Sequence, residues 1–342
     1  MMEHKLSAGP LLDARGHLSE AGWSTSLIRT YRRSDIRANR LRIKEWDYYL
    51  VMNDHYGAAL TIADNSYMNM LSVSLLDFDT PREITSSIIK PLTFGRTGLP
   101  ESSREGNVSF SNDRIQISFI NEGGVRRLIC HYLDFKDGKP FDCEITLSDE
   151  PEDSLVIATP YRDDPKAFYY NQKINCMRAE GFMSFDGRTY DFRKEDSFGC
   201  LDWGRGVWTY ENTWYWSNIS GNYEGHRFGW NLGYGFGDTS AASENVFFFD
   251  GKANKIGKVE FVIPKNEAGN DDFMKQWRIS GDRTDIVFDP LIDRASDTNV
   301  YLIRSNQHQV FGRFSGKCIL DDGTEIVLKD FMGFAEKVYN RW

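Results

Sequence analysis

The chain has 342 residues, of which 40% are hydrophobic and 14% aromatic, and its formal net charge is −9. A chain of this length can bury one large hydrophobic core or two ordinary ones. The acidic balance argues against nucleic acid or an anionic membrane surface as the main partner.

The cysteines and the apolar segments exclude further classes of protein. The five cysteines form no C-x-x-C pair and have no histidine at ligand spacing, so we expect no metal site and no disulfide framework. No apolar segment is as long as the hydrophobic part of a signal peptide or as a membrane span. We therefore expect a cytoplasmic protein without a cofactor, and its oligomeric state stays open.

Residues 1–45 are expected to form an N-terminal segment that is partly helical. This segment contains a local run of six arginines, which we interpret as a solvated face or helix. The run consists of Arg29, Arg32, Arg33, Arg37, Arg40 and Arg42.

From Trp46 onward the sequence consists of short strand-like runs separated by turn signals. The runs 115–120 and 125–135 flank Asn121-Glu122-Gly123-Gly124, which predicts a hairpin. Four Asp-Gly dipeptides predict further turns: they begin at Asp137, Asp186, Asp250 and Asp322. Because the turns are dense and no 3.6-residue period is sustained, the pattern predicts an all-β sandwich or barrel.

A repeated pattern divides the remaining chain in two. The motif D-x-x-G-x-x-[DE] occurs at 196–202 and again at 330–336, each time after an Asp-Gly turn and a strand. The runs WDYYLV (46–51) and WYWSNI (214–219) are both led by aromatic residues. We therefore expect two related β domains, 46–200 and 201–342, each ending in the same kind of closing strand.

Four of the nine tryptophans lie between Ser197 and Gly221, close to Asp202. If this stretch is extended, successive side chains point to opposite faces, so Asp202 faces away from Trp203. The stretch Gly204–Gly206 is expected to bulge and to re-aim Asp202 or Arg205.

Asp202 is the candidate catalytic residue. Burial against a tryptophan-rich wall would raise the pKa of its carboxyl group, which could then donate a proton to an alkene or a glycosidic oxygen. Aromatic faces would stabilise the developing cation by roughly 0.5–2 kcal/mol each. Two alternatives stay open for Asp202: it orients a ligand, or it forms a structural ion pair with Arg205.

The candidate ligand-binding residues surround Asp202 in the sequence. Arg205 could anchor a carboxylate or phosphate of the ligand. Trp214 and Trp216 could line a cavity or fill a core, and Glu211 could form a glycosidase-like pair with Glu224 or lie in a solvated turn. The complete set of expected ligand-binding residues is Trp203, Arg205, Tyr210, Glu211, Trp214 and Trp216.

Several of these motifs resemble the DUF2804 family of bacterial proteins. The resemblance rests on KEWDYYLVMNDHYGAALTIADNSY, SFGCLDWGRGVWTYENTWYW, GWNLGYGFGD and GRFSGKCILDDGTEIVLKDFMGFAEKVYNRW. That family is similar to a calycin-like group containing hydroxyneurosporene synthase (a carotenoid hydratase), tocopherol cyclase and the AttH proteins. Members of that group carry a glycine and then an acid at the end of each domain, matched here by Gly199 with Asp202 and Gly333 with Glu336.

The resemblance implies two lipocalin-like (calycin-like) antiparallel β-barrels packed together, with ligand cavities lined by aromatic residues. One departure concerns the mechanism, because Trp203 stands where the carotenoid hydratase pattern has histidine. The expected partner is a small apolar or amphipathic ligand. We expect acid catalysis without metal, as a hydratase, cyclase or isomerase. The alternatives are a carrier that leaves its ligand unchanged and a carbohydrate-active enzyme, and we expect Glu336 to be structural.

Overall fold

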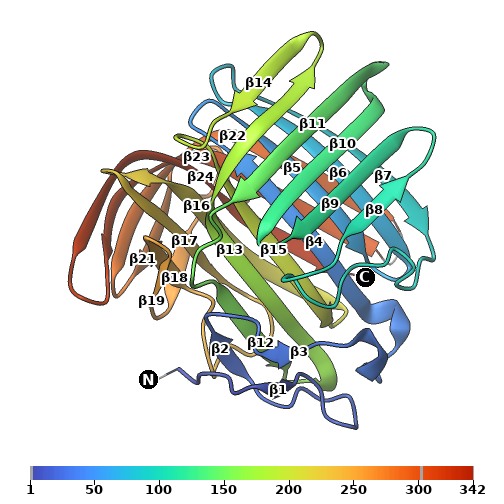
Figure 1. Ribbon diagram of the computed structural model, residues 1–342. Coiled ribbons are helices and arrows are strands. Elements are labelled where there is room, and N and C mark those ends of the chain that lie inside the picture. Colours follow the sequence, from blue (N-terminus) through green and yellow to red (C-terminus); the bar gives the residue numbers. More distant parts are fainter. Residues whose placement is uncertain (1–2, 301–302, 342) are drawn as a thin grey trace.

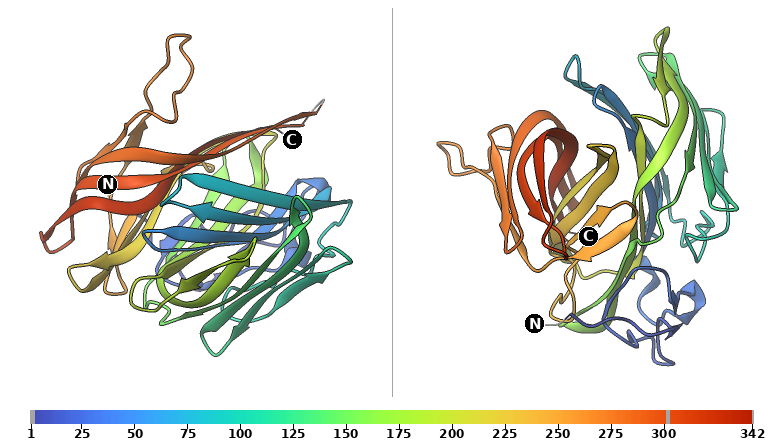
Figure 2. Two further views of the ribbon diagram at one scale, coloured as in Figure 1. Left: turned by 90° about the horizontal axis from the view of Figure 1, so that it is seen from above. Right: turned by 60° about the vertical axis from the view of Figure 1, so that its left-hand side comes forward.

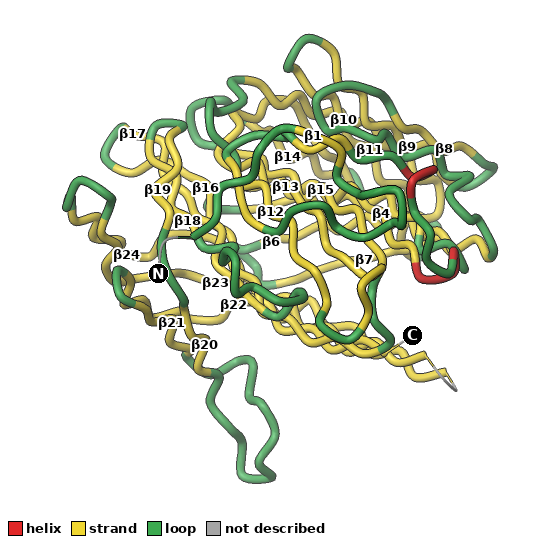
Figure 3. Tube along the Cα trace, turned by 90° about the horizontal axis from the view of Figure 1, so that it is seen from below, coloured by secondary structure: helices red, strands yellow, loops and turns green. Residues whose placement is uncertain are grey.

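The computed structural model describes residues 3–300 and 303–341, and these form an almost entirely antiparallel β structure (Figure 1). The predicted all-β fold of two lipocalin-like antiparallel β-barrels packed together is confirmed, with each barrel present as a curled, half-closed sheet. Helix within the described ranges is limited to two 3-10 turns, Arg33–Asp35 and Arg40–Arg42, drawn red in Figure 3. No helix of these ranges is long and apolar enough to cross a membrane.

The N-terminal segment wraps along one end of the first sheet (Figure 1). It contributes three short strands: β1 (Gly9–Pro10), β2 (Gly22–Ser24) and β3 (Arg29–Thr30). Part of its arginine run is bound rather than solvated, since Arg33 pairs with the buried Glu45 and Arg42 pairs with Asp164 at 2.5 Å.

The first sheet has thirteen strands and runs β7-β6-β5-β4-β15-β13-β11-β10-β9-β8, with β2, β12 and β14 attached beside this path. The bounds are β4 (Ile43–Met52), β5 (Tyr56–Asp64), β6 (Met68–Asp77), β7 (Arg82–Pro91), β8 (Val108–Ser111), β9 (Ile115–Glu122), β10 (Val125–Lys136), β11 (Lys139–Ser148), β12 (Leu155–Tyr161), β13 (Asp164–Phe185), β14 (Arg188–Phe192) and β15 (Phe198–Val207).

The second sheet has nine strands in the order β19-β18-β17-β16-β24-β23-β22-β21-β20. The bounds are β16 (Glu211–Tyr223), β17 (His226–Tyr234), β18 (Val246–Phe249), β19 (Lys252–Lys255), β20 (Val259–Val262), β21 (Trp277–Gly281), β22 (Thr284–Val300), β23 (Ile303–Ile319) and β24 (Glu325–Arg341). β15, which ends at Val207, pairs with β4 and β13 in the first sheet. β16, which begins at Glu211, belongs to the second sheet, so the chain passes from one sheet to the other between these two residues.

The hairpin turns follow the sequence signals. Val125 pairs with Glu122, as the hairpin prediction requires. At the β10–β11 turn both Asp137 (φ 53°) and Gly138 (φ 73°) have positive φ, as a type I′ turn demands. The Asp-Gly pairs that begin at Asp186 and Asp250 repeat this geometry.

Three apolar clusters hold the two sheets. One cluster forms the core on the concave side of the first sheet, and a second cluster forms the core of the second sheet. The third joins the two sheets where they pack side by side (Figure 2), and it includes Leu50 and Cys200 from the first sheet and Phe311 and Phe334 from the second. In each sheet the last long strand pairs with the strand that opens it, β15 with β4 and β24 with β16. This pairing brings the ends of both repeats to the interface.

Candidate functional site

A cavity of about 640 Å³ lies between the two sheets. Its walls come from β4–β7, β13 and β15 of the first sheet and from β16 and β22–β24 of the second, with a contribution from the β17–β18 loop. The space for a ligand therefore lies between the two curled sheets.

The two acids of the repeated motif both face this cavity. Asp202 on β15 lies opposite Lys173 on β13, and Glu336 on β24 lies opposite Trp216 on β16. Both carboxylates are buried, with exposed fractions of 6% and 4%. Equivalent strands of the two sheets thus deliver one acid each to a shared space.

Asp202 forms a buried ion pair with Lys173. The Nζ atom of Lys173 lies 2.8 Å from Oδ1 of Asp202, and Nδ2 of Asn171 donates to the same oxygen at 2.6 Å. The ammonium also lies 3.8 Å from the ring centroid of Trp216. The alternative in which Asp202 pairs with Arg205 is wrong, because these two side chains point to opposite faces of β15 and Arg205 pairs with Asp47 instead.

Glu336 is held by two donors. Its Oε1 accepts a hydrogen bond from Nε1 of Trp214 at 2.8 Å, and its Oε2 accepts one from Nε2 of Gln309 at 3.1 Å. Burial raises the pKa of Glu336 to about 7, against the lowering effect of the Trp214 hydrogen bond. The negative charge of Asp202 adds to this increase in pKa. Glu336 can therefore give or take a proton near neutral pH.

A third acid, Glu244, reaches the cavity from the β17–β18 loop. Burial raises its pKa to about 7, while the charge of Lys173 lowers it. Its backbone carbonyl accepts a hydrogen bond from Nδ2 of Asn231 at 2.7 Å, and Oδ1 of Asn231 accepts one from Trp216 at 2.6 Å. Sequence reasoning missed both Glu244 and Lys173, since neither belongs to a motif.

An aromatic wall stands beside these acids. The ring of Phe236 stacks between Tyr169 (centroids 4.3 Å apart) and Trp214 (4.7 Å). Trp208 meets Trp214 edge-on at 5.6 Å, and Trp46 stacks on Tyr169 at 6.2 Å. The hydroxyl of Tyr169 is buried and has no hydrogen-bond partner among the described residues.

The glycines of β15 allow close packing of neighbouring groups and do not form a β-bulge. β15 pairs with β4 and β13 without a register shift at Gly204 or Gly206, so the expected bulge is wrong. A Cβ atom at Gly204 would lie 2.0 Å from the ring of Trp46, which crosses the strand at this point. Gly204 therefore allows Trp46 to join the cavity wall.

The structure separates the predicted site residues into three groups, of which the first lies in the cavity. Asp202, Trp214 and Trp216 line it. The second group, Trp203 and Arg205, points from the other face of β15 into the core of the first sheet, as strand alternation predicts.

Arg205 is fully engaged in that core. It has no exposed surface, pairs with Asp47 at 3.0 Å and donates to the carbonyl of Pro100 at 2.7 Å. Its guanidinium also lies 4.2 Å from the ring centroid of Trp203. Neither residue lines the inter-sheet cavity.

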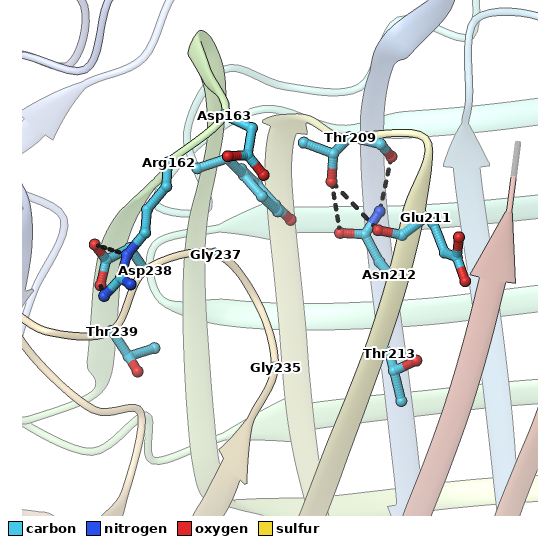
Figure 4. A pocket seen from close by; sticks show the side chains of 11 residues that line it. Arg162, Asp163, Thr209, Glu211, Asn212, Thr213, Gly235, Gly237, Asp238 and Thr239 are labelled. Atoms are coloured by element: carbon cyan, nitrogen blue, oxygen red, sulfur yellow. Dashed lines mark hydrogen bonds and ion pairs between the residues drawn. The ribbon is translucent and has the colours of Figure 1, made fainter.

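The third group lies outside the cavity. Tyr210 is half exposed, and Glu211 lines a separate surface groove of about 540 Å³ (Figure 4). In this groove the ion pair of Asp238 with Arg162 (2.8 Å) lowers the pKa of Asp238, and Glu211 accepts a hydrogen bond from the hydroxyl of Tyr339 at 2.9 Å. Within the described ranges no group of three or more His, Cys, Asp or Glu side chains could hold a metal ion.

We compared the chain with known protein families and solved structures. The sequence profile of DUF2804, a domain of unknown function, matches residues 3–342. A solved structure assigned to AttH from Nitrosomonas europaea superposes with a TM-score of 0.56 at 11% identity, covering 93% of this chain and 98% of that chain. No curated protein matches the sequence.

Two further solved structures align less closely. Kievitone hydratase from Nectria haematococca gives a TM-score of 0.45 at 13% identity, covering 93% of this chain and 95% of that one. CghA with Sch210972 gives 0.44 at 9% identity, covering 87% of this chain and 88% of that one. The similarity to AttH concerns the fold alone.

Proposed function

The chain belongs to the DUF2804 family, and we propose that it binds a mostly apolar small molecule between its two sheets and transforms it by acid–base catalysis. One observation carries this proposal. Three buried carboxylates, those of Asp202, Glu244 and Glu336, line the same cavity as the ammonium of Lys173, beside an aromatic wall. Two of these acids have pKa values near 7, where an acid or base is most effective at physiological pH.

The roles follow from the different surroundings of the acids. Glu336, protonated, donates its proton to a carbon of a double bond, forming a C–H bond and a cation at the neighbouring carbon. Asp202, paired with Lys173, supplies a fixed negative charge beside the cation. Faces of Trp214 and Tyr169 would stabilise it further, by roughly 0.5–2 kcal/mol per ring.

The class of reaction depends on the step that consumes the carbocation. Attack by water forms a C–O bond and releases a proton to a carboxylate, which is a hydration. Attack by a second double bond closes a ring and leaves a new cation, which then loses a neighbouring proton to a carboxylate. Direct loss of a proton from the first cation to a carboxylate moves the double bond. All three return a proton to the acid cluster, so no metal or nucleotide is required for balance.

Ligand extraction tests this function. The protein, Glu336→Gln and Asp202→Asn are purified in parallel, studied by native mass spectrometry and extracted with solvent, with Glu211→Gln of the surface groove as the control. We expect an apolar molecule that accumulates in a different chemical form in Glu336→Gln, while the control matches the parent protein. The same molecule in the same form and amount in all four proteins would indicate a carrier. Absence of any bound molecule in all four would count against the binding function itself.

A further inference from the structure

Arg294 is a cation of the cavity wall that lacks a carboxylate partner. It lies on β22 and donates to Oε1 of Gln309 at 2.6 Å and to Oγ1 of Thr85 at 3.4 Å. No carboxylate of the described residues lies within ion-pair distance of its guanidinium. Inward-facing arginines elsewhere are paired, as Arg205 is with Asp47 and Arg126 is with Glu150 at 2.8 Å. Arg294 thus keeps unused donor capacity inside a ligand-sized space.

The charged side chains that line the cavity carry one positive charge in excess, which a single anionic group of a ligand would balance. Burial holds the pKa values of Glu244 and Glu336 near 7, so both are largely protonated just below neutral pH. The remaining charges are then the two cations, Lys173 and Arg294, against the one anion, Asp202. A single negative charge on the ligand neutralises this set, whereas a phosphate dianion exceeds it by one charge.

The two walls of the cavity mouth differ in chemistry. On the first sheet the wall includes three large apolar side chains, Met68, Met70 and the exposed Ile89, beside a few polar residues. On the second sheet alternate positions of β22 and β23 present hydroxyl and amide groups that make no hydrogen bond to another described residue. These positions are Ser296, Thr298, Ser305 and Gln307. Such a mouth suits a molecule with an apolar edge and a polar edge.

We propose that the ligand is an apolar molecule bearing one carboxylate, which binds the guanidinium of Arg294 while its carbon skeleton lies against the apolar and aromatic wall. This inference rests on the proposed function and names the class of its substrate. The planar guanidinium fork matches a carboxylate with two parallel hydrogen bonds. The negative charge of the bound ligand would also favour the protonated form of the nearby Glu336, so binding prepares the acid for proton transfer.

A matched pair of probes tests the carboxylate. Dodecanoate and dodecan-1-ol share one carbon skeleton, and the affinity of each is to be measured by displacement of the neutral fluorophore N-phenyl-1-naphthylamine at pH 6.5. We expect the full-length protein to bind dodecanoate about tenfold more tightly than dodecan-1-ol, as a charge-assisted hydrogen-bond pair provides. In Arg294→Gln the ratio should fall to about one while the affinity for dodecan-1-ol is retained, and Arg294→Lys should keep part of the preference. Arg162→Gln, which removes an exposed arginine of the surface groove, should keep the full ratio.

The outcomes separate this inference from the proposed function. Equal affinities for the two probes in the parent protein, or an unchanged ratio in Arg294→Gln, would overturn the carboxylate assignment and leave the cavity as a ligand site. Failure of the fluorophore and of both probes to bind would overturn the assignment together with the proposed function. Thermal unfolding of each variant shows that a lost preference is not lost folding.

Discussion

At the scale of single residues, the site contains several buried carboxyl groups whose surroundings differ. Asp202 has a cationic partner at 2.8 Å, whereas Glu336 is bound by the neutral donors of Trp214 and Gln309. In the proposed mechanism this difference assigns proton donation to Glu336 and charge stabilisation to Asp202. Glu244 adds a second acid whose pKa lies near 7.

These raised pKa values predict how stability depends on pH. Glutamate ordinarily titrates at 4.5, and Glu244 and Glu336 titrate at about 7 in the folded protein. Between these values the folded state binds more protons than the unfolded state, so the free energy of unfolding falls as the pH rises from 4.5 to above 7. The loss is at most about 3 kcal/mol per group.

Urea unfolding at pH 5 and pH 8 measures this loss. Glu244→Gln, which removes one of the two glutamates with a raised pKa, should lose less stability than the parent protein over the same interval. Glu211→Gln, on the surface, should behave like the parent. Equal losses in the parent protein and in Glu244→Gln would show that Glu244 is already ionised in the fold.

At the scale of elements, β15 separates two kinds of surface. Its residues alternate between the inter-sheet cavity, reached by Asp202, and the first core, reached by Trp203 and Arg205. On the cavity face Gly204 leaves room for the ring of Trp46, which forms part of the aromatic wall. A side chain at position 204 would displace that ring.

Gly204→Ala tests this packing. The added methyl group cannot coexist with the ring of Trp46, so we expect a loss of about 1–3 kcal/mol in unfolding free energy. Combining it with Trp46→Leu should cost less than the sum of the two single changes, because the smaller side chain relieves the clash. Additive losses in urea unfolding would contradict a direct clash.

At the scale of the whole molecule, the two sheets contribute matching aromatic residues to the site. Trp46 and Tyr48 of β4 correspond to Trp214 and Trp216 of β16, and all four line the cavity. Tyr48 and Trp216 meet there with their ring centroids 6.0 Å apart. Both sheets therefore contribute aromatic surface to one shared site.

The turns and the strand alternation were predictable from sequence, because turn chemistry and pleat period are local properties. The position of the cavity was not, because it depends on how the two sheets pack. The same alternation separates Asp202 from Arg205, but it does not say which face is the core. Lys173 and Glu244 come from distant segments, and only the register of β13 with β15 and the path of the β17–β18 loop place them beside Asp202.

Deuterium incorporation tests the central claim most directly. The parent protein and Glu336→Gln are incubated with their bound molecule in D₂O, and the extracted molecule is examined by mass spectrometry after exchangeable protons are washed out with H₂O. Acid catalysis at carbon predicts carbon-bound deuterium in the molecule from the parent protein and much less in that from Glu336→Gln. A bound molecule without carbon-bound deuterium in both proteins would contradict proton transfer by Glu336 and leave the inter-sheet cavity as a binding site only.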